Sequence, residues 1–204
     1  MARYTGPKLR LMRREGIDLG LKSRSNTKVA KRLAVPPGAH GAKGKRKSRS
    51  FGIQLREKQK LRAIYGMLEK QFVRFYTMAD KQKGATGELM LQFLERRLDN
   101  VIYRLGMAPT RAAARQLVSH GHIKVNNVRV SIPSYLVLEN QVISLDDKAL
   151  KVPSVKETLE LIKETDVPEW LERKAMVGKI KTLPTRADAP KEVDEALIVE
   201  YYSR

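Results

Sequence analysis

The sequence contains no cysteine among its 204 residues, and this absence excludes disulfide bridges and thiolate metal sites. No apolar run approaches the roughly 20 residues that a membrane-spanning helix requires, so no membrane partner is expected. The residues that follow Met1 also lack the apolar core of a secretory signal. The sequence therefore predicts a protein of the cytoplasm, or of an organelle with bacterial-type gene expression such as the plastid stroma.

Acidic residues are scarce relative to basic ones. The chain has 22 Asp and Glu against 41 Lys and Arg, a net charge of +19. Residues 1–50 hold 15 basic and 2 acidic side chains, whereas residues 151–204 hold 10 and 11. An enzyme for small metabolites rarely needs such an excess, but a polyanion partner does, because each neutralised phosphate releases condensed counterions.

Residues 1–50 show little apolar periodicity and are rich in Lys, Arg, Gly, Ser and Pro. We expect an extended segment with short helices over Leu9–Glu15 and Lys28–Leu33, and a turn at Pro36-Pro37-Gly38. A dense basic cluster follows, made of Lys43, Lys45, Arg46, Lys47 and Arg49. Such a cluster is often a solvated tail, but here it flanks ordered segments, which favours RNA contact.

From Gln54 the apolar residues recur three and four positions apart and predict one helix that runs to about Lys81. Its aromatic side chains are interpreted as core residues rather than as platforms for base stacking. Gly84 and Gly87 bracket a loop, after which a further helix begins near Glu88. Four basic residues near the start of the long helix are expected to extend the basic surface: Arg56, Lys58, Lys60 and Arg62.

Two shorter helices and a tight turn are predicted in the middle of the chain. The apolar spacing predicts a helix over Arg96–Leu105, ended by Gly106, which can adopt positive φ. Thr110 is expected to be the N-cap of a second helix that stops at Gly121. Small and aliphatic residues fall on one side of this second helix, which indicates that it packs against a core.

The opposite side of the second helix is polar and is expected to be an outer surface. Its members are Arg111, Arg115, Gln116, Ser119 and His120. With Lys124, which follows on the next segment, they are predicted to contact RNA phosphates and sugars, because a guanidinium can grip two phosphate oxygens. Arg111→Ala and Arg115→Ala are accordingly expected to weaken RNA binding without unfolding the chain.

A β-hairpin follows the second helix. Ile123–Val125 and Val128–Val130 alternate with period two around Asn126-Asn127, and Asn tolerates the left-handed conformation of a two-residue turn. Two further strands are predicted at Ser134–Leu138 and Gln141–Leu145.

The remaining chain mixes helix and strand signals. Ser154 and Glu157 match a capping box and predict a helix to about Glu164. Val177–Leu183 is predicted as a strand, and Glu195–Tyr202 as a strand or a helix that packs on the helical domain.

The expected fold class is α+β: a mainly helical domain with an inserted small α/β-hairpin RNA-binding module and an extended basic N-terminal segment. The expected boundaries are 1–50 for the basic segment, 51–95 and 150–204 for the helical domain, and 96–149 for the module of helix-turn-helix plus hairpins.

Several long segments of this sequence resemble those of one known family. Three of these segments are similar to the RNA-binding module named after the fourth small-subunit ribosomal protein. They are Arg96-Arg97-Leu98-Asp99-Asn100-Val101, Ala114-Arg115-Gln116-Leu117-Val118-Ser119-His120-Gly121 and Ile132-Pro133-Ser134-Tyr135. Segments outside the module match the same family, for example Gln54-Leu55-Arg56-Glu57-Lys58-Gln59-Lys60. The chain therefore resembles the bacterial or plastid form of that family over nearly its whole length. Leu9 and Met12 stand where some members carry zinc-binding cysteines, so the zinc-free branch is expected, with neither metal nor cofactor.

The resemblance implies a structural protein that binds small-subunit ribosomal RNA at a multi-helix junction in its 5′ region and nucleates the body of the subunit. It also implies contact with the fifth small-subunit ribosomal protein, a position near the mRNA entry channel, an influence on translational accuracy, and a monomer within the ribosomal particle. A free translational repressor or factor is the alternative. Besides the residues above, the N-terminal residues expected to contact RNA are Arg3, Lys8, Arg13, Arg14 and His40.

One enzyme reading competes with this interpretation. Arg97-Leu98-Asp99 matches the motif that contains the catalytic Asp of RNA pseudouridine synthases, which often carry the same module. However, Asn100-Val101-Ile102-Tyr103 follows instead of Thr-Ser-Gly, and Asp99 falls within a helical repeat, in reach of Arg96 or Tyr103. The sequence therefore predicts a protein that is not an enzyme. His120 and His122 are spaced for contacts with RNA or the local turn rather than for a shared metal ion.

Overall fold

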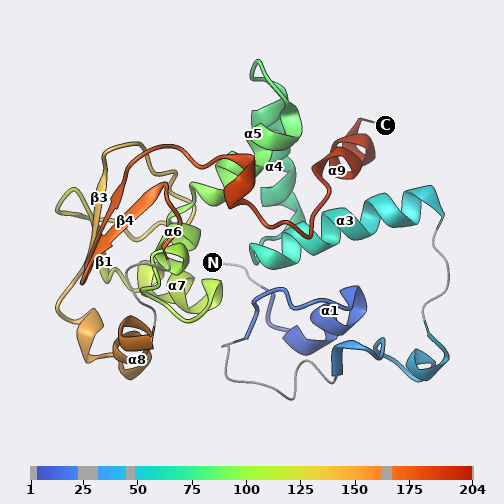
Figure 1. Ribbon diagram of the computed structural model, residues 1–204, viewed down its shortest axis with the longest axis horizontal. Coiled ribbons are helices and arrows are strands. Elements are labelled where there is room, and N and C mark those ends of the chain that lie inside the picture. Colours follow the sequence, from blue (N-terminus) through green and yellow to red (C-terminus); the bar gives the residue numbers. More distant parts are fainter. Residues whose placement is uncertain (1–3, 23–31, 45–48, 162–166, 204) are drawn as a thin grey trace. The chain divides into compact units, whose positions relative to one another are not determined.

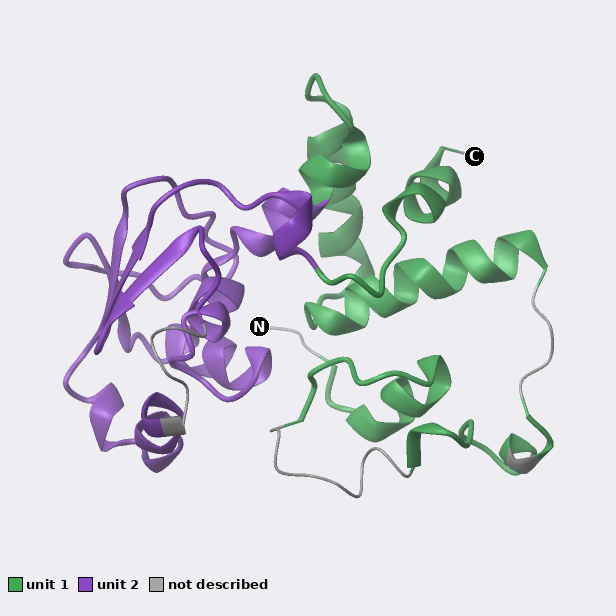
Figure 2. Ribbon diagram, in the orientation of Figure 1, with its two compact units in different colours: residues 1–90, 190–204 green, residues 91–189 purple. Residues whose placement is uncertain are grey.

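The structure is a computed structural model that describes residues 4–22, 32–44, 49–161 and 167–203. The chain divides into two compact units: unit 1 comprises residues 1–90 and 190–204, and unit 2 comprises residues 91–189 (Figure 2). The described residues are rich in helix and include a small antiparallel sheet, which confirms the predicted α+β class. Within these ranges, no helix has the length and apolar character needed to cross a membrane.

Unit 1 is built from helices (Figure 1). They are α1 (Lys8–Glu15), the 3-10 turn η1 (Gly41–Lys43), α3 (Ser50–Ile64), α4 (Glu69–Asp80) and α9 (Glu195–Tyr202). Helix α1 confirms the short helix predicted at Leu9–Glu15, and it ends where Gly16 takes a φ of 81° and donates to the Met12 carbonyl. Of the helix predicted over Lys28–Leu33, residues 28–31 lie outside the described ranges.

The single long helix predicted from Gln54 to Lys81 is wrong. The chain leaves helix α3 at Ile64 because Gly66 adopts a φ of 61°, and α4 begins only at Glu69. Apolar spacing continues on both sides of this turn, since Leu61 and Phe72 are both fully buried. Periodicity alone therefore concealed the break, and Gly66 was the local signal for it.

Helix α9 resolves the choice between strand and helix at the C-terminal end. It packs against α3, where the Tyr201 and Phe51 ring centroids are 5.6 Å apart, and against α4, where Tyr202 lies 4.6 Å from Tyr76. Its N-cap is Asp194, whose carboxylate accepts a hydrogen bond from the Ala196 amide. The predicted packing on the helical part of the chain is thus confirmed.

Helix α5 (Thr86–Glu95) carries the chain from unit 1 into unit 2, and it begins two residues before the predicted Glu88. The other helices of unit 2 are α6 (Leu98–Arg104), α7 (Arg111–Ser119), the 3-10 turn η2 (Ala149–Lys151), α8 (Pro153–Leu161) and the 3-10 turn η4 (Arg186–Asp188). The predicted cap of α7 is confirmed, because the Thr110 side chain accepts from the Ala113 amide at 3.2 Å. Gly106 takes the predicted positive φ, 68°, and Gly121, where α7 was predicted to stop, takes a φ of 72°.

The described residues of unit 2 form a five-stranded antiparallel sheet in the order β2-β1-β3-β5-β4. The strands are β1 (Ile123–Val125), β2 (Val128–Arg129), β3 (Val142–Leu145), β4 (Leu171–Lys174) and β5 (Val177–Ile180). The predicted hairpin is confirmed, with φ of 47° at Asn126 and 65° at Asn127. β3 and β5 also fall where strands were predicted.

The strand predicted at Ser134–Leu138 is wrong. Apart from an isolated bridge between Arg97 and Leu136, this described segment forms no strand. The Tyr135 carbonyl instead accepts from the Leu98 amide of α6 at 2.8 Å, and the carbonyl of Pro133, just before the segment, accepts from the Asp99 amide at 3.2 Å. The segment therefore satisfies the open N-terminus of a helix rather than a neighbouring strand.

Strand β4, which the sequence analysis did not predict, joins the sheet through β5. Both strands come from residues that the sequence analysis grouped with the helical domain, so the structure's division differs from the expected boundary at residue 150. Leu171 and Ile180 explain the difference, because both are buried in the same core as the module. Arg173 of β4 also donates to the Leu105 carbonyl at 2.9 Å, at the C-terminal end of α6.

The core of unit 2 lies between the sheet and helices α6 and α7. Ile123, Val125 and Ile143 point inward from the strands and are buried with Leu98 and Val118 of the helices. Each such side chain stabilises the fold by about 1.5–3 kcal/mol relative to exposure to water. The core therefore presents one side of α7 and one side of the sheet to solvent.

Candidate nucleic-acid interface

The polar side of α7 is only partly an outer surface. Gln116, Ser119 and His120 are exposed, as the sequence predicts, and Arg111 is half-buried. Arg115 is 8% exposed, so its place in the predicted outer stripe is wrong. Helical spacing puts it on the same side as Arg111, but it cannot reveal that another charged residue packs against that position.

Arg115 belongs to a buried charged cluster centred on Asp99. Its Nη1 lies 3.7 Å from Asp99 Oδ2, while Arg97 donates to the two carboxylate oxygens of Asp99 at 3.0 and 2.7 Å. The partner of Asp99 is thus Arg97 rather than Arg96 or Tyr103. Asp99 itself is 4% exposed. The attraction between the Asp99 carboxylate and the two guanidinium groups offsets part of the cost of removing these charges from water.

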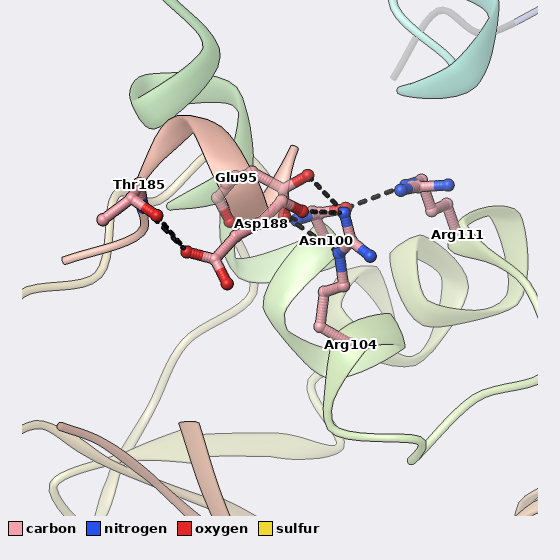
Figure 3. A network of polar contacts seen from close by, with 6 residues as sticks. All are labelled: Glu95, Asn100, Arg104, Arg111, Thr185 and Asp188. Atoms are coloured by element: carbon pink, nitrogen blue, oxygen red, sulfur yellow. Dashed lines mark hydrogen bonds and ion pairs between the residues drawn. The ribbon is translucent and has the colours of Figure 1, made fainter. Parts of the chain in front are cut away.

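Arg111 is held in a defined position by two neighbours from α6. Its Nε donates to Asn100 Oδ1 at 2.8 Å, and its guanidinium carbon lies 4.5 Å from the centroid of the Tyr103 ring. Figure 3 shows Arg111 at the end of a chain of polar contacts that leads back through Asn100 into the protein. A guanidinium fixed in this way loses little side-chain entropy when it binds an anion.

The other end of this network is an anchor at Glu95. The Asn100 amide donates to Glu95 Oε2 at 2.7 Å, and Arg104 grips both oxygens at 2.7 and 3.0 Å. Arg104 also donates to the Asp188 carbonyl at 2.7 Å, beside the capping box that Thr185 and Asp188 form (Figure 3). The position of Arg111 therefore depends on contacts among α5, α6 and η4.

The β1–β2 hairpin adds two cations. Its register places Lys124 opposite Arg129, so both side chains point to the same side of the sheet. Lys124 lies 3.0 Å from Asp146, and the hydrogen bond from its ammonium holds the pKa of Asp146 below its ordinary value. Arg129 is exposed and donates to the His120 carbonyl at 3.2 Å, over Gly121, where a side chain would collide with it.

Sequence reasoning missed Arg129 as a candidate site residue. The signal was present, because a two-residue turn at Asn126-Asn127 pairs Val125 with Val128 and therefore Lys124 with Arg129. The structure brings Arg129 beside the exposed end of α7, next to His120. The rings of His120 and His122 have centroids 6.1 Å apart, and no cluster of three or more potential metal ligands occurs in the described ranges.

The predicted N-terminal site residues of unit 1 fall into three groups. Arg14, His40, Lys43 and Arg49 are exposed, whereas Lys8 and Arg13 are half-buried. Arg13 donates to the carbonyl groups of Val35 at 2.8 Å and Pro36 at 3.0 Å, so it fastens the predicted proline turn to α1. The others lie outside the described residues: Arg3, Lys45, Arg46 and Lys47.

Lys58 does not belong to the predicted basic surface of α3. It is 4% exposed, and its ammonium lies 2.6 Å from Glu69 and 4.4 Å from the centroid of the Tyr201 ring. Tyr202 donates to the same carboxylate at 2.9 Å. Lys58 therefore holds α4 and α9 against α3. Arg56, Lys60 and Arg62 are half-buried and pair with Glu15, Glu57 and Glu69.

Family comparisons agree with this arrangement of a helical N-terminal unit and a small mixed module. Residues 3–95 match the family model described as the ribosomal protein S4/S9 N-terminal domain, and residues 96–143 match that of the S4 domain. The matched S4 domain contains α6, α7 and the hairpin with the exposed polar residues described above. These features place the chain among S4-domain proteins.

Individual relatives match the chain from end to end. It is 50% identical over 207 residues to the small ribosomal subunit protein uS4 of Thioalkalivibrio sulfidiphilus, with 100% of both chains covered. It is 49% identical over 209 residues to uS4 of Geotalea daltonii and 50% identical over 210 residues to uS4A of Symbiobacterium thermophilum, again with 100% of both chains covered. The chain belongs to the uS4 family of small ribosomal subunit proteins, which confirms the resemblance found in its sequence.

Proposed function

We propose that this chain is a structural constituent of the small ribosomal subunit in the cytoplasmic ribosome and that it binds the subunit's RNA directly. The observation that carries this proposal is the identity of about half of all residues, over the full length, with proteins named for that subunit. The net charge of +19 supports a partner that is a polyanion.

The proposed RNA contacts of unit 2 lie along the outer side of α7, from Arg111 at its start to His120 at its end, and on the adjoining hairpin. They comprise Arg111, Gln116, Ser119, His120, Lys124 and Arg129. In unit 1 the proposed contacts are the exposed Arg14, His40, Lys43 and Arg49 together with Lys8. A-form RNA hides its major-groove edges, so these groups would recognise phosphates, sugars and the shape of a junction. A junction in the 5′ region of the subunit RNA is the proposed target, from which the body of the subunit assembles.

The proposal also covers protein and mRNA contacts. Contact with the fifth small-subunit ribosomal protein and a place near the mRNA entry channel would give the chain its influence on translational accuracy. It would act there as a monomer, without a metal ion or a cofactor.

We propose further that the chain is not an enzyme. The burial of Asp99 supports this, because a carboxylate that is 4% exposed and bonded twice to Arg97 is not presented to a uridine. An enzyme that used this residue would isomerise uridine in ribosomal RNA and lose the activity in Asp99→Asn. Purified protein that produces no pseudouridine in the 5′-domain RNA would agree with a structural role.

Binding of the full chain to 5′-domain RNA in a salt series tests the main proposal. Affinity should fall with rising salt, with a slope of about −0.7 to −0.9 for each phosphate contacted. Arg111→Lys keeps the charge but loses the planar fork held by Asn100, so it should weaken binding by about 1 kcal/mol, or roughly fivefold. A flat salt series for the wild-type chain would contradict the proposal.

Sedimentation separates the proposed role from that of a free translational repressor or factor. A structural constituent should stay with small subunits through a high-salt wash, whereas a loosely bound factor should leave them. Recovery of the chain only in the ribosome-free fraction would favour the repressor.

A further inference from the structure

The sheet of unit 2 has one buried and one open side. Ile123, Ile143 and Ile180 point inward and are fully buried beneath α6 and α7, which lie to one side of the strands in Figure 1. The residues that alternate with them point outward and are exposed or half-buried. We call this open side the outer sheet face.

The strand register arranges the outward side chains in rows. One row joins Arg129, Lys124, Ser144, Val177 and Lys174, each paired with the next across neighbouring strands. It crosses the whole sheet, from β2 to β4, over four strand spacings or about 19 Å. A second row pairs Val142 with Lys179 and Lys179 with Glu172.

This face is predominantly cationic. Its positive side chains are Lys124, Arg129, Lys174, Lys179 and Lys181. Its carboxylates are Asp146, 3.0 Å from Lys124, and Glu172, 3.2 Å from Lys174 and 3.9 Å from Lys181. Two carboxylates therefore offset only part of the positive charge. Lys174 keeps 82% of its side chain exposed, so its ammonium is accessible to a further anion.

The composition of the face favours RNA over a protein partner. Interfaces with nucleic acids are polar and strongly positive, whereas the centre of a protein–protein interface is apolar and poor in charge. Val142 and Val177 are the apolar members of the described rows; Val142 pairs with Lys179, and Val177 pairs with Ser144 and Lys174. The face is also continuous with the proposed RNA surface, because Arg129 bonds the His120 carbonyl at the end of α7.

We propose that the outer sheet face is a second phosphate-binding surface, which extends the RNA contact of unit 2 from the hairpin onto β4 and β5. This inference rests on the proposed function and deepens it. The S4-domain match ends at residue 143, so Lys174, Lys179 and Lys181 lie outside it. Strands β4 and β5 thus widen the module's sheet and supply cations that the matched domain lacks.

The test compares the full wild-type chain with the triple variant Lys174→Gln, Lys179→Gln, Lys181→Gln on 5′-domain RNA. For each phosphate that the variant no longer binds, the salt slope should decrease by about 1. If each of the three lysines binds one phosphate, the affinity ratio of wild type to variant should then fall about 60-fold between about 50 and 200 mM salt. Nuclease protection should disappear at one group of nucleotides and persist at those protected by α7.

Two controls make the result decisive. Glu172→Gln removes a competing carboxylate on the same face, so it should bind RNA more tightly and with a steeper salt slope. Lys81→Gln, Lys83→Gln, Lys191→Gln changes the net charge equally at exposed positions of unit 1 and should keep the wild-type protection at the nucleotides that the first triple variant leaves unprotected.

The outcomes separate this inference from the proposed function. If the wild-type chain does not bind the RNA, the proposed function fails. If the wild type binds and the first triple variant has the same slope and protection, only the outer sheet face is overturned. A variant that binds RNA normally but is no longer retained in assembled subunits would make the face a protein-docking surface, which also overturns the inference.

Discussion

Glu95 and Arg104 form a bidentate ion pair. The Glu95 side chain is fully buried, whereas 22% of the Arg104 side-chain surface is exposed to solvent. The distances are 2.7 Å from Nη2 to Oε1 and 3.0 Å from Nε to Oε2. Because Asn100 bonds the same carboxylate and also accepts from Arg111, the pair supports the proposed RNA surface as well as the fold.

Glu95→Ala should destabilise unit 2 by about 3 kcal/mol, because it leaves Arg104 without its buried counter-charge. Chemical denaturation followed by fluorescence of the single tryptophan measures this, since Trp170 is buried in unit 2. Glu88→Ala, at an exposed position of the same helix, should stay within about 0.5 kcal/mol of wild type. Equal stability of the two variants would contradict the role assigned to the ion pair.

A comparison of Arg115→Ala with Gln116→Ala should distinguish the role of a buried side chain on α7 from that of its exposed neighbour. Arg115→Ala is expected to lower the free energy of unfolding by about 1–2 kcal/mol, because Asp99 loses one of its two buried cations but keeps both bonds to Arg97. Gln116→Ala should leave stability unchanged and weaken RNA binding about fivefold, because one hydrogen bond is removed. Should Arg115→Ala weaken binding with no loss of stability, the outer stripe predicted from helical spacing would be right after all.

Acid should loosen unit 1 through Glu69. Burial acts to raise the pKa of Glu69, but hydrogen bonds from Lys58 and Tyr202 and the nearby charge of Arg62 outweigh it, so the pKa lies below its ordinary value. A carboxyl whose pKa is lowered by folding contributes stability above its unfolded pKa of about 4.3 and loses it as pH falls further.

The contribution of Glu69 should stay below about 1 kcal/mol, because solvent screens a carboxylate whose side chain is 41% exposed. Denaturation of wild type and Glu69→Gln, followed by far-ultraviolet circular dichroism, should show a stability difference that is present near neutral pH and shrinks below about pH 4. A difference that grows on acidification would have the wrong sign.

Gly66→Ala should lower the free energy of unfolding by about 1–2 kcal/mol. The added methyl group would meet no atom within 4 Å, so the cost comes from the φ of 61° alone. Gly66→Asn should cost less, because Asn tolerates the left-handed conformation. An alanine variant as stable as wild type would contradict the cost assigned to this φ.

Local chemistry accounts for what the sequence predicted well. Thr110 caps α7, Gly106 ends α6, and Asn126-Asn127 turn the hairpin, because each depends on the residue itself and its immediate neighbours. The exposed Gln116, Ser119 and His120 likewise follow from helical spacing next to an apolar stripe.

Partners that are distant in sequence account for what was missed. Lys58 is buried because Glu69 and Tyr201 meet its ammonium, and Tyr201 lies 143 residues away. Arg173 sits in a strand with charged neighbours, yet it is buried because the Leu105 carbonyl accepts from it. The sequence analysis predicted Lys58 as part of a basic surface and gave no signal for Arg173, because only the folded arrangement supplies the compensating group in each case.

The late position of β4, β5 and α9 along the chain sets the order in which a newly made molecule can mature. Before residues 177–180 are synthesised, one edge of β3 has no paired strand, and its backbone amides and carbonyls can hydrogen-bond to a strand of another chain. Helix α3 likewise waits for residues 195–202 before its apolar side is covered. A stop codon ahead of Leu171 would therefore leave both compact units incompletely packed, although it removes only the last sixth of the chain.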